Sequence, residues 1–233
     1  MCEYHAMKKT RDIFWKLKLQ AHKWENYFDI YDKILLPYID KHPKFLEIGC
    51  AHGGSLELWI KYFEGKLDLY GVDINKDFLG YKFDDVEVNY SCVDQGSQEH
   101  WDAYLRDGKT FDIIIDDGSH IMNDQIVTLL TLFPKLNQGG MYIIEDTHTS
   151  YWSDWDGGLQ KQGTCIEFCK HLIDFLHAPH ITRTPPTEIA KTFKDLVSVE
   201  FYNSMIVLRK EHVPHPAKPA HSEEGRDPNF VWG

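Results

Sequence analysis

The stretch Phe111-Asp-Ile-Ile-Ile-Asp-Asp-Gly-Ser-His120, followed by Met141-Tyr-Ile-Ile-Glu-Asp-Thr-His148, predicts the fold of this 233-residue chain. Each segment is a short apolar run that ends in acids and a histidine, and buried parallel strands have such continuous apolar runs. Ligands of open α/β sheets bind just beyond the carboxyl ends of the strands. Neighbouring strands lie about 4.8 Å apart, so acids from both segments can share one cation. We therefore expect these side chains in one crevice: Asp116, Asp117, His120, Glu145 and Asp146.

Outward from these two segments, strand-like runs alternate with helical patterns. Strands are expected at residues 45–49, 67–72, 86–90, 111–115 and 141–144, and helices at 55–63, 98–105, 123–136 and 163–176. This alternation is typical of βαβ units with a parallel sheet. Residues 197–208 contain two further strand-like runs around Asn203-Ser204, which predicts a closing hairpin. The fold class is α/β.

The chain divides into three parts. Residues 1–40 are predicted to be an N-terminal helical segment, because Tyr27, Ile30, Tyr31 and Ile34 recur at helical spacing. Residues 41–211 form the α/β domain. Residues 212–233 contain four prolines and mostly polar side chains, so we expect a disordered tail.

Charge and composition limit the classes of partner. Lys and Arg total 25 against 36 Asp and Glu, a net charge of −11, which disfavours nucleic acid and anionic membranes. No apolar run has the length of a membrane span, and the N-terminus lacks the apolar stretch of a signal peptide. The expected location is cytoplasmic. The five scattered cysteines indicate reduced thiols, and Cys165 and Cys169 are interpreted as core residues.

A glycine-rich turn, Glu47-Ile-Gly49-Cys-Ala-His-Gly53-Gly54-Ser55, lies between the first strand and its helix. Glycines there let a ligand approach the backbone, and Asp73 at the end of the next strand can accept hydrogen bonds from two ribose hydroxyls. A dinucleotide site needs Gly-x-Gly-x-x-Gly, but Ala51 replaces the middle glycine. The charge of Glu47 would repel a pyrophosphate and suit a cationic sulfonium. Asp94, after the third strand, can accept from an adenine amino group.

This pattern resembles the class I S-adenosylmethionine-dependent methyltransferases, whose acidic strand-end residues match Glu47, Asp73 and Asp94. The resemblance covers about residues 40–210. It implies a Rossmann-like seven-stranded methyltransferase sheet, mostly parallel, with a C-terminal antiparallel hairpin. The residues expected to bind S-adenosylmethionine are Glu47, Gly49, Gly53, Ser55, Asp73, Asp94, Gln95 and Asp116.

The two opening segments, taken together, look like the metal-dependent sugar O-methyltransferases of macrolide biosynthesis, the mycinamicin and macrocin type. They are also similar to the related rhamnosyl O-methyltransferase and cephalosporin hydroxylase group. The resemblance implies that Asp117, Glu145 and Asp146 bind Mg²⁺ and that His120 is the general base. The segment Lys23-Trp-x-x-Tyr27-x-x-x-Tyr31 has a loose counterpart near the cofactor entrance of that family. Some members carry a large N-terminal domain, whereas about forty residues precede the first strand here, so the acceptor and the oligomeric state stay open.

The chemistry of these residue types agrees with that resemblance. A sugar hydroxyl is a poor nucleophile at neutral pH, and a hard cation held by carboxylates lowers its pKa. An imidazole within hydrogen-bond reach accepts the proton. Oxygen ligands favour Mg²⁺ or Mn²⁺ over Zn²⁺. The simpler interpretation is that Asp116 and Asp117 cap a turn and that His120 is a turn histidine.

Aromatic side chains follow the second acidic segment. Tyr151, Trp152 and Trp155 lie in a loop that ends at Gly157-Gly158. Exposed aromatics on a glycine-hinged loop suit stacking on a sugar and closure of a lid. The alternative is that these rings pack the loop onto the domain.

The predicted function is transfer of a methyl group from S-adenosylmethionine to a sugar hydroxyl of a small-molecule or glycan acceptor. One alternative is O-methylation of a non-sugar diol such as a catechol. Others are an NAD-dependent enzyme, a metal-dependent hydrolytic enzyme and a non-catalytic cofactor-binding module. Hydride transfer usually needs Tyr-x-x-x-Lys after the fourth strand, and the instances here, Tyr4/Lys8 and Tyr62/Lys66, precede it.

Overall fold

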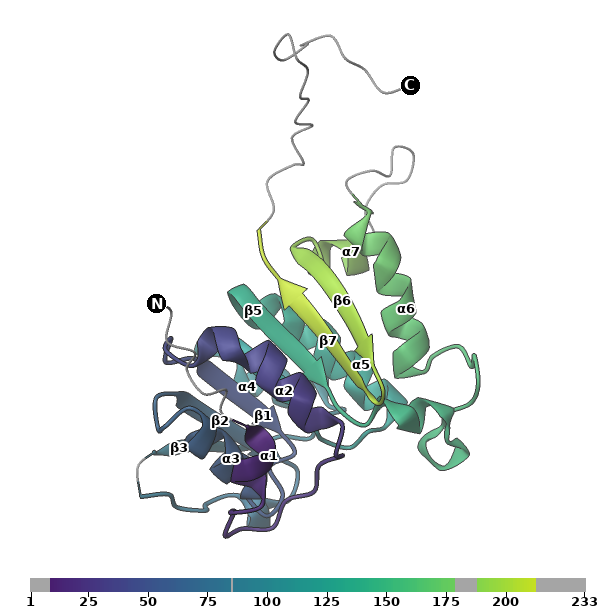
Figure 1. Cartoon of the computed structure of the whole chain (residues 1–233). Helices are drawn as coiled ribbons and strands as arrows, with labels where there is room; N and C mark the ends of the chain where they lie inside the picture. Colours follow the sequence, from purple (N-terminus) through teal and green to yellow (C-terminus); the bar gives the residue numbers. More distant parts are fainter. Residues whose placement is uncertain (1–8, 85, 179–187, 213–233) are drawn as a thin grey trace, which may run out of the picture.

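A twisted seven-stranded sheet forms the centre of the computed structural model, which describes residues 9–84, 86–178 and 188–212 (Figure 1). The strands are β1 Lys44–Ile48, β2 Asp68–Asp73, β3 Val88–Cys92, β4 Phe111–Asp116, β5 Leu136–Ile144, β6 Leu196–Tyr202 and β7 Met205–Lys210. The helices are α1 Thr10–Phe14, α2 Tyr27–Leu35, α3 Gly54–Tyr62, α4 Gln98–Tyr104, α5 Met122–Leu132, α6 Cys165–Leu176 and α7 Glu188–Thr192.

The strand order is β3-β2-β1-β4-β5-β7-β6. The pairs among β1 to β5 are parallel, whereas β7 runs antiparallel to both β5 and β6. The sequence-based prediction of a mostly parallel seven-stranded sheet is confirmed. The hairpin expected around Asn203-Ser204 joins β6 to β7.

Strands β4 and β5 are buried because both faces of the sheet are covered. Successive side chains of a strand point to opposite faces. Ile113 and Ile115 accordingly join one apolar cluster, and Ile114 joins the other. Continuous apolar runs are therefore what this position in the sheet requires.

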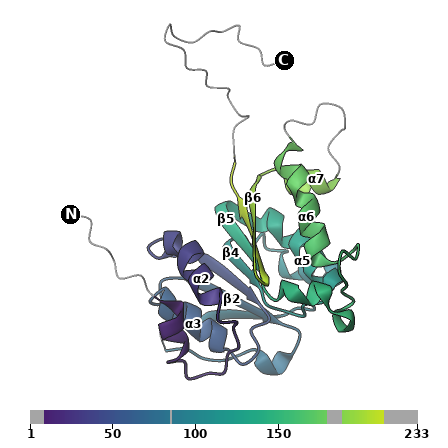
Figure 2. The ribbon, with the colours of Figure 1, turned by 45° about the vertical axis from the view of Figure 1, so that its right-hand side comes forward.

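Helices cover the two faces in two groups, as Figures 1 and 2 show. Side chains of α2 and α3 pack in the first cluster, and those of α4, α5 and α6 pack in the second. Cys165 and Cys169 are buried free thiols in the second cluster, which confirms that they are core residues. Among the described helices, none combines the length and apolar character needed to cross a bilayer.

The N-terminal segment differs from its prediction. The helical segment expected over residues 1–40 is interrupted where it is described, and residues 15–26 form an irregular connection between α1 and α2 that we call the N-terminal strap. The backbone N–H groups of Lys18 and Leu19 both donate to Glu57 Oε2 at 2.9 Å. A Cβ on Gly54 would lie 2.3 Å from the Gln20 carbonyl oxygen, so the strap crosses directly over the start of α3. These tertiary contacts replace helical hydrogen bonds, and the helical spacing of apolar residues does not predict them.

Two smaller differences concern boundaries. The third strand begins at Val88, two residues later than expected, and β5 extends back to Leu136. The proline-containing tail beyond residue 212 and the first eight residues lie outside the described residues, so the predictions for them stay predictions.

Candidate active site

The carboxyl ends of four strands lie at one level of the sheet. Ile48 of β1 pairs with Val72 of β2 on one side and with Asp116 of β4 on the other, and Asp116 pairs with Ile144 of β5. The residues that follow these positions therefore share one edge: Gly49, Asp73, Asp117 and Glu145. Strand order reverses between β1 and β4, and such a switch point is where α/β folds bind ligands.

A cavity of about 310 Å³ opens at this edge. Predicted cofactor residues on its wall are Gly49, Asp73, Asp94 and Gln95, joined by Asp117 of the acidic segment. The structure thus brings together loops that follow β1, β2, β3 and β4.

The glycine turn after β1 packs closely against neighbouring chain segments. Gly49 has a φ of +85°, and a Cβ there would lie 2.1 Å from the carbonyl oxygen of Asp117. Gly53 has a φ of +78° and is the N-cap of α3. Both positions require glycine, because other residues rarely adopt this backbone region. Of this turn, Gly49 and Ala51 line the cavity.

Asp73 and Asp94 extend from neighbouring strand ends. Asp73 Oδ2 accepts from the Ala51 backbone N–H at 3.0 Å and Oδ1 accepts from that of Asn75 at 2.8 Å. Asp94 Oδ1 accepts from the Gly96 N–H at 3.0 Å. Each carboxylate oxygen can accept a second hydrogen bond. The backbone bonds therefore orient both acids and leave capacity for ribose and adenine donors.

Glu47 lies in β1 and is fully buried. Neither of its carboxylate oxygens has a hydrogen-bond partner among the described residues, and the nearest cation is the Lys23 ammonium, 4.0 Å away. Burial raises the pKa of Glu47 to about 7, opposed by the charge of Lys23. The Ser55 and Trp59 side chains lie close enough to lower this pKa but make no hydrogen bond of good geometry, so the buried carboxylate can accept from a further donor.

Asp116 and Gln95 support the loop that follows β4. Asp116 accepts from Gln95 Nε2 at 2.6 Å and from the Tyr142 hydroxyl at 3.1 Å, and burial raises its pKa to about 7. Gln95 Oε1 accepts from the Ser119 N–H at 2.8 Å. Four residues expected to contact the cofactor are not among those lining the cavity: Glu47, Gly53, Ser55 and Asp116.

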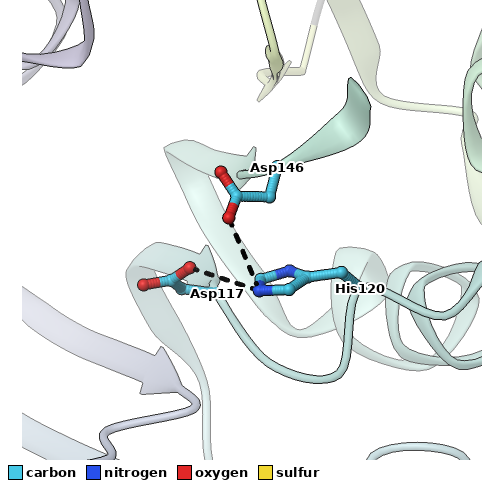
Figure 3. A group of neighbouring side chains, drawn as sticks. All are labelled: Asp117, His120 and Asp146. Carbon is cyan, nitrogen blue, oxygen red and sulfur yellow. Dashed lines mark ion pairs between the residues drawn. The ribbon is translucent and has the colours of Figure 1, made fainter. Parts of the chain in front are cut away.

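Asp117, His120 and Asp146 converge on one point (Figure 3). His120 Nε2 lies 3.9 Å from Asp117 Oδ1 and 3.6 Å from Asp146 Oδ2, and one ligand atom from each residue lies within 4.8 Å of the others. His120 and Asp146 have φ angles of +56° and +53°. Non-glycine residues in this region cluster at functional sites, because the surrounding structure must hold the strain. This cluster can accommodate a metal ion.

Glu145, the third predicted metal ligand, is engaged by other groups. Its Oε1 accepts from the Tyr31 hydroxyl, and its Oε2 accepts from Lys23 Nζ at 2.8 Å. The same ammonium lies 2.7 Å from Asp117 Oδ2. Burial raises the pKa of Glu145 to about 8, opposed by the charge of Lys23. The pKa of Lys23 itself is raised, because the attraction of Asp117, Glu145 and Glu47 outweighs the opposing effect of burial.

Lys23 and Tyr31 were not among the predicted site residues. The Lys23 side chain is 1% exposed, so its charge lies entirely within the acidic cluster. Tyr27 belongs to the same group, since its hydroxyl lies 2.7 Å from Asp146 Oδ1 and accepts from the Asp146 N–H at 2.9 Å. Two signs of this role were present in the sequence: the loose counterpart of the Lys23–Tyr31 segment in the resembling family, and a spacing of four residues, which is equally typical of a core-facing helix.

A second cavity, of about 550 Å³, lies on the other side of the acidic cluster. Asp117, Glu145 and Asp146 line it from the sheet edge, and the N-terminal strap lines it with Lys23 and Trp24. Asp117 also lines the first cavity. The two cavities therefore meet at Asp117.

The aromatic loop is more compact than expected. Residues 147–151 and 153–155 form short 3₁₀ turns, and a Cβ on Gly157 would lie 2.4 Å from the Thr149 carbonyl oxygen. Tyr151 and Trp152 are about half exposed, whereas Trp155 packs against the second apolar cluster. None of the three lines either cavity.

Comparisons with known proteins identify relatives of this chain, although no family model matches it. It is 33% identical over 208 residues to the 8-demethyl-8-alpha-L-rhamnosyl tetracenomycin-C 2'-O-methyltransferase of Streptomyces olivaceus, covering 83% of this chain and 53% of the relative. It is 30% identical over 191 residues to the mycinamicin VI 2''-O-methyltransferase of Micromonospora griseorubida, covering 77% and 47%. The chain spans about half the length of the curated relatives it matches.

A solved structure agrees with these relatives. The MycE methyltransferase of the mycinamycin biosynthetic pathway, in complex with Mg and SAH, superposes with a TM-score of 0.73 at 28% identity. The match covers 87% of this chain and 53% of that one. By sequence, strand order and fold, the chain belongs to the class I S-adenosylmethionine-dependent methyltransferases, as a homologue of the sugar O-methyltransferases of antibiotic biosynthesis.

Proposed function

We propose that this chain transfers a methyl group from S-adenosylmethionine to a hydroxyl group of a sugar, with Mg²⁺ or Mn²⁺ bound at its acidic cluster. The acceptor is a small molecule or a glycan. The named relatives are O-methyltransferases, two of them acting on a rhamnosyl tetracenomycin and on mycinamicin VI by name. The cytoplasmic location expected from the sequence stays a prediction.

The first cavity has the donors and acceptors that S-adenosylmethionine needs. Buried Glu47 directly precedes Ile48 of the cavity wall, and neither of its carboxylate oxygens makes a hydrogen bond of good geometry among the described residues, whereas the methionine ammonium and sulfonium groups of the cofactor are cationic. Asp73 and Asp94 lie on the wall of the same cavity, where they can accept from ribose hydroxyls and the adenine amino group. The glycine turn removes the side chains that would otherwise obstruct the approach.

The acidic cluster also fits a hard divalent cation. Asp117 and Asp146 offer carboxylate oxygens that lie with His120 within 4.8 Å of one another. Glu145 lies outside that group and accepts from Tyr31 and Lys23, and its oxygens retain lone pairs for a cation. Oxygen donors of this kind suit Mg²⁺ and Mn²⁺. When bound, such a cation polarises a coordinated hydroxyl group and lowers its pKa.

His120 has the position of a general base. Its Nε2 faces the two carboxylates without reaching hydrogen-bond distance to either, so this nitrogen can accept a proton from a hydroxyl group at the cluster (Figure 3). Thr149 Oγ1 donates to the His120 carbonyl oxygen at 3.0 Å and helps to hold the strained backbone of this residue. Asp117 lines both cavities, so it can orient a hydroxyl acceptor in the 550 Å³ cavity while its loop borders a methyl donor in the 310 Å³ cavity.

One observation carries the proposal: the cofactor cavity and the acidic cavity share Asp117. A methyl donor and a hydroxyl acceptor bound in the two cavities would meet at this residue. A non-catalytic module or a hydrolase would not need two cavities that share this carboxylate. O-methylation of a catechol stays the second candidate, because a bound divalent cation would lower the pKa of a catechol hydroxyl in the same way.

The test is a methyl-transfer assay with the purified chain, S-adenosylmethionine and methyl α-L-rhamnopyranoside, which offers a vicinal diol. We expect product in Mg²⁺, none in EDTA, and recovery when Mg²⁺ is added back. S-adenosylhomocysteine should raise the melting temperature and NAD should not. Full activity in EDTA would contradict the metal role, and transfer to catechol alone would favour the second candidate.

A further inference from the structure

Two tryptophans of the N-terminal region are unusually exposed. Trp15 is 74% exposed and Trp24 is 52% exposed, whereas Trp59 and Trp101 are fully buried. Both exposed rings line the 550 Å³ cavity that holds Asp117 and Asp146. Ligand pockets of this size combine aromatic walls with a few polar groups that set orientation.

The strap holds Trp24 beside the acids. Its neighbour Lys23 is anchored to Asp117 and Glu145, and Tyr27, three residues further on, is anchored to Asp146. The Tyr27 N–H also donates to the Trp24 carbonyl oxygen at 3.0 Å. Because contacts on both sides fix the backbone of Trp24, its ring can bind a ligand at low cost in conformational entropy.

Building on the proposed function, we propose that Trp24 is the platform on which the acceptor sugar stacks, with Trp15 as a second wall of the same cavity. A pyranose ring has an apolar face of C–H groups and a polar edge of hydroxyls. The indole covers the apolar face, and the hydroxyl edge meets Asp117 and Asp146 of the same cavity. The strap thereby selects acceptors that carry a diol next to an apolar ring face.

This assignment differs from the one expected from the sequence, which placed the stacking rings at Tyr151, Trp152 and Trp155. Trp152 contacts His148 at 4.5 Å between ring centroids, and His148 contacts Trp24 at 5.4 Å. His148 thus separates Trp152 from Trp24, and Trp152 does not line the cavity. Of Trp152, His148 and Trp24, only Trp24 lines the cavity that the acids line.

The experiment compares Trp24→Ala with Trp152→Ala, a matched control because Trp152 is 47% exposed. The probe is methyl α-L-rhamnopyranoside, titrated with S-adenosylhomocysteine and Mg²⁺ present and followed by saturation-transfer NMR, alongside KM and kcat. Trp24→Ala should weaken binding and raise KM about three- to tenfold with little change in kcat. Trp24→Phe should recover most of the affinity, and Trp15→Ala should show a smaller loss.

Other readouts separate the possible failures. The melting shift with S-adenosylhomocysteine should be unchanged in both variants, which shows that they are folded and bind cofactor. If wild type binds the glycoside and Trp24→Ala binds it equally well, the platform assignment is wrong while the proposed function stands. A larger loss in Trp152→Ala would return the platform to the 151–155 loop. If wild type binds cofactor but no glycoside, the sugar proposal and this inference both fail. If Trp24→Ala changes the molecular mass in solution but not glycoside binding, the ring is a contact between copies of the chain and not the platform.

Discussion

The two halves of the site are built in different ways. On the β1–β3 side, Asp73 and Asp94 are oriented by backbone N–H groups of their own or the neighbouring loop, those of Ala51 and Asn75 for Asp73 and that of Gly96 for Asp94. On the β4–β5 side, the acids are completed by the N-terminal region. Lys23 reaches Asp117 and Glu145 across 94 and 122 residues of sequence.

The difference shows how far local sequence determines a site. A glycine turn or an acid at the end of a strand can be assigned to the site from sequence, because the carboxyl ends of parallel strands lie at one edge of the sheet. A buried ammonium that arrives from a distant segment changes the charge of the cluster without leaving a local pattern. The following predictions test whether the two halves are separable in this way.

The largest effect is expected for His120→Asn, which tolerates the left-handed backbone of this residue but cannot accept the proton. Turnover should fall about 10²- to 10⁴-fold. Binding of S-adenosylhomocysteine and of Mn²⁺, followed by melting shift and by electron paramagnetic resonance, should stay close to wild type. A parallel loss of Mn²⁺ binding would make His120 a metal ligand rather than a base.

Lys23→Met should destabilise the fold by about 3–5 kcal/mol, because it leaves buried acids without their counter-charge. Mg²⁺ should restore part of the lost free energy of unfolding, measured by urea denaturation, since it supplies the missing positive charge. Lys66→Met is the control, because Lys66 forms an exposed ion pair with Glu64 and should change stability by about 1 kcal/mol or less. Equal stability of the Lys23 variant and wild type would show that the strap is not part of the acidic cluster.

Asp73→Ala tests the cofactor half. It should weaken S-adenosylhomocysteine binding about ten- to a hundredfold, because hydrogen bonds to a charged group contribute about 1.5–3 kcal/mol. Asp68→Ala, at the opposite end of the same strand, should leave the affinity unchanged. Calorimetric titration distinguishes the two variants. Loss of Mn²⁺ binding in Asp73→Ala would show that the two halves are coupled.

The pH dependence of the free energy of unfolding tests Asp116, which lies between the two halves and accepts hydrogen bonds from Gln95 and Tyr142. Burial raises the pKa of Asp116 to about 7, from 3.8, so the folded state holds a proton that the unfolded state has released between these values. The contribution of Asp116 to stability is complete below about pH 4 and is lost as the pH rises through 7. In EDTA, Asp116→Asn should reduce this fall by about 1.4 kcal/mol per pH unit at most. An unchanged slope in urea denaturation between pH 5 and 7 would contradict it.

The smallest effect is expected in the aromatic loop, residues 150–158. The sequence-based prediction of a mobile lid means fast hydrogen exchange there without acceptor and slower exchange with it. The close packing of Gly157 against the Thr149 carbonyl oxygen favours a compact turn instead. Strong, equal protection in both states would assign the loop to the scaffold, and the N-terminal strap would then be the segment to examine for closure.

The sequence by itself determined the sheet, its order of elements and the edge where the site lies. Apolar runs of the β4 and β5 type are stable only when both faces are covered, and their abrupt acidic ends mark the level at which the sheet meets solvent. The glycine turn after β1 could also be predicted from sequence, because its backbone conformation at Gly49 and Gly53 favours glycine over other residues.

Only the tertiary structure decided which side chains complete that edge. Helical spacing in residues 27–34 reports that one side of a helix is buried, but it does not report what lies opposite. The interrupted helix follows from contacts between the strap and α3, and the buried Lys23 ammonium follows from contacts with strand ends more than ninety residues away. Because such contacts depend on the assembled sheet and not on local propensity, the Lys23–Tyr31 segment could be placed near the site only by resemblance, and its partners could not be named.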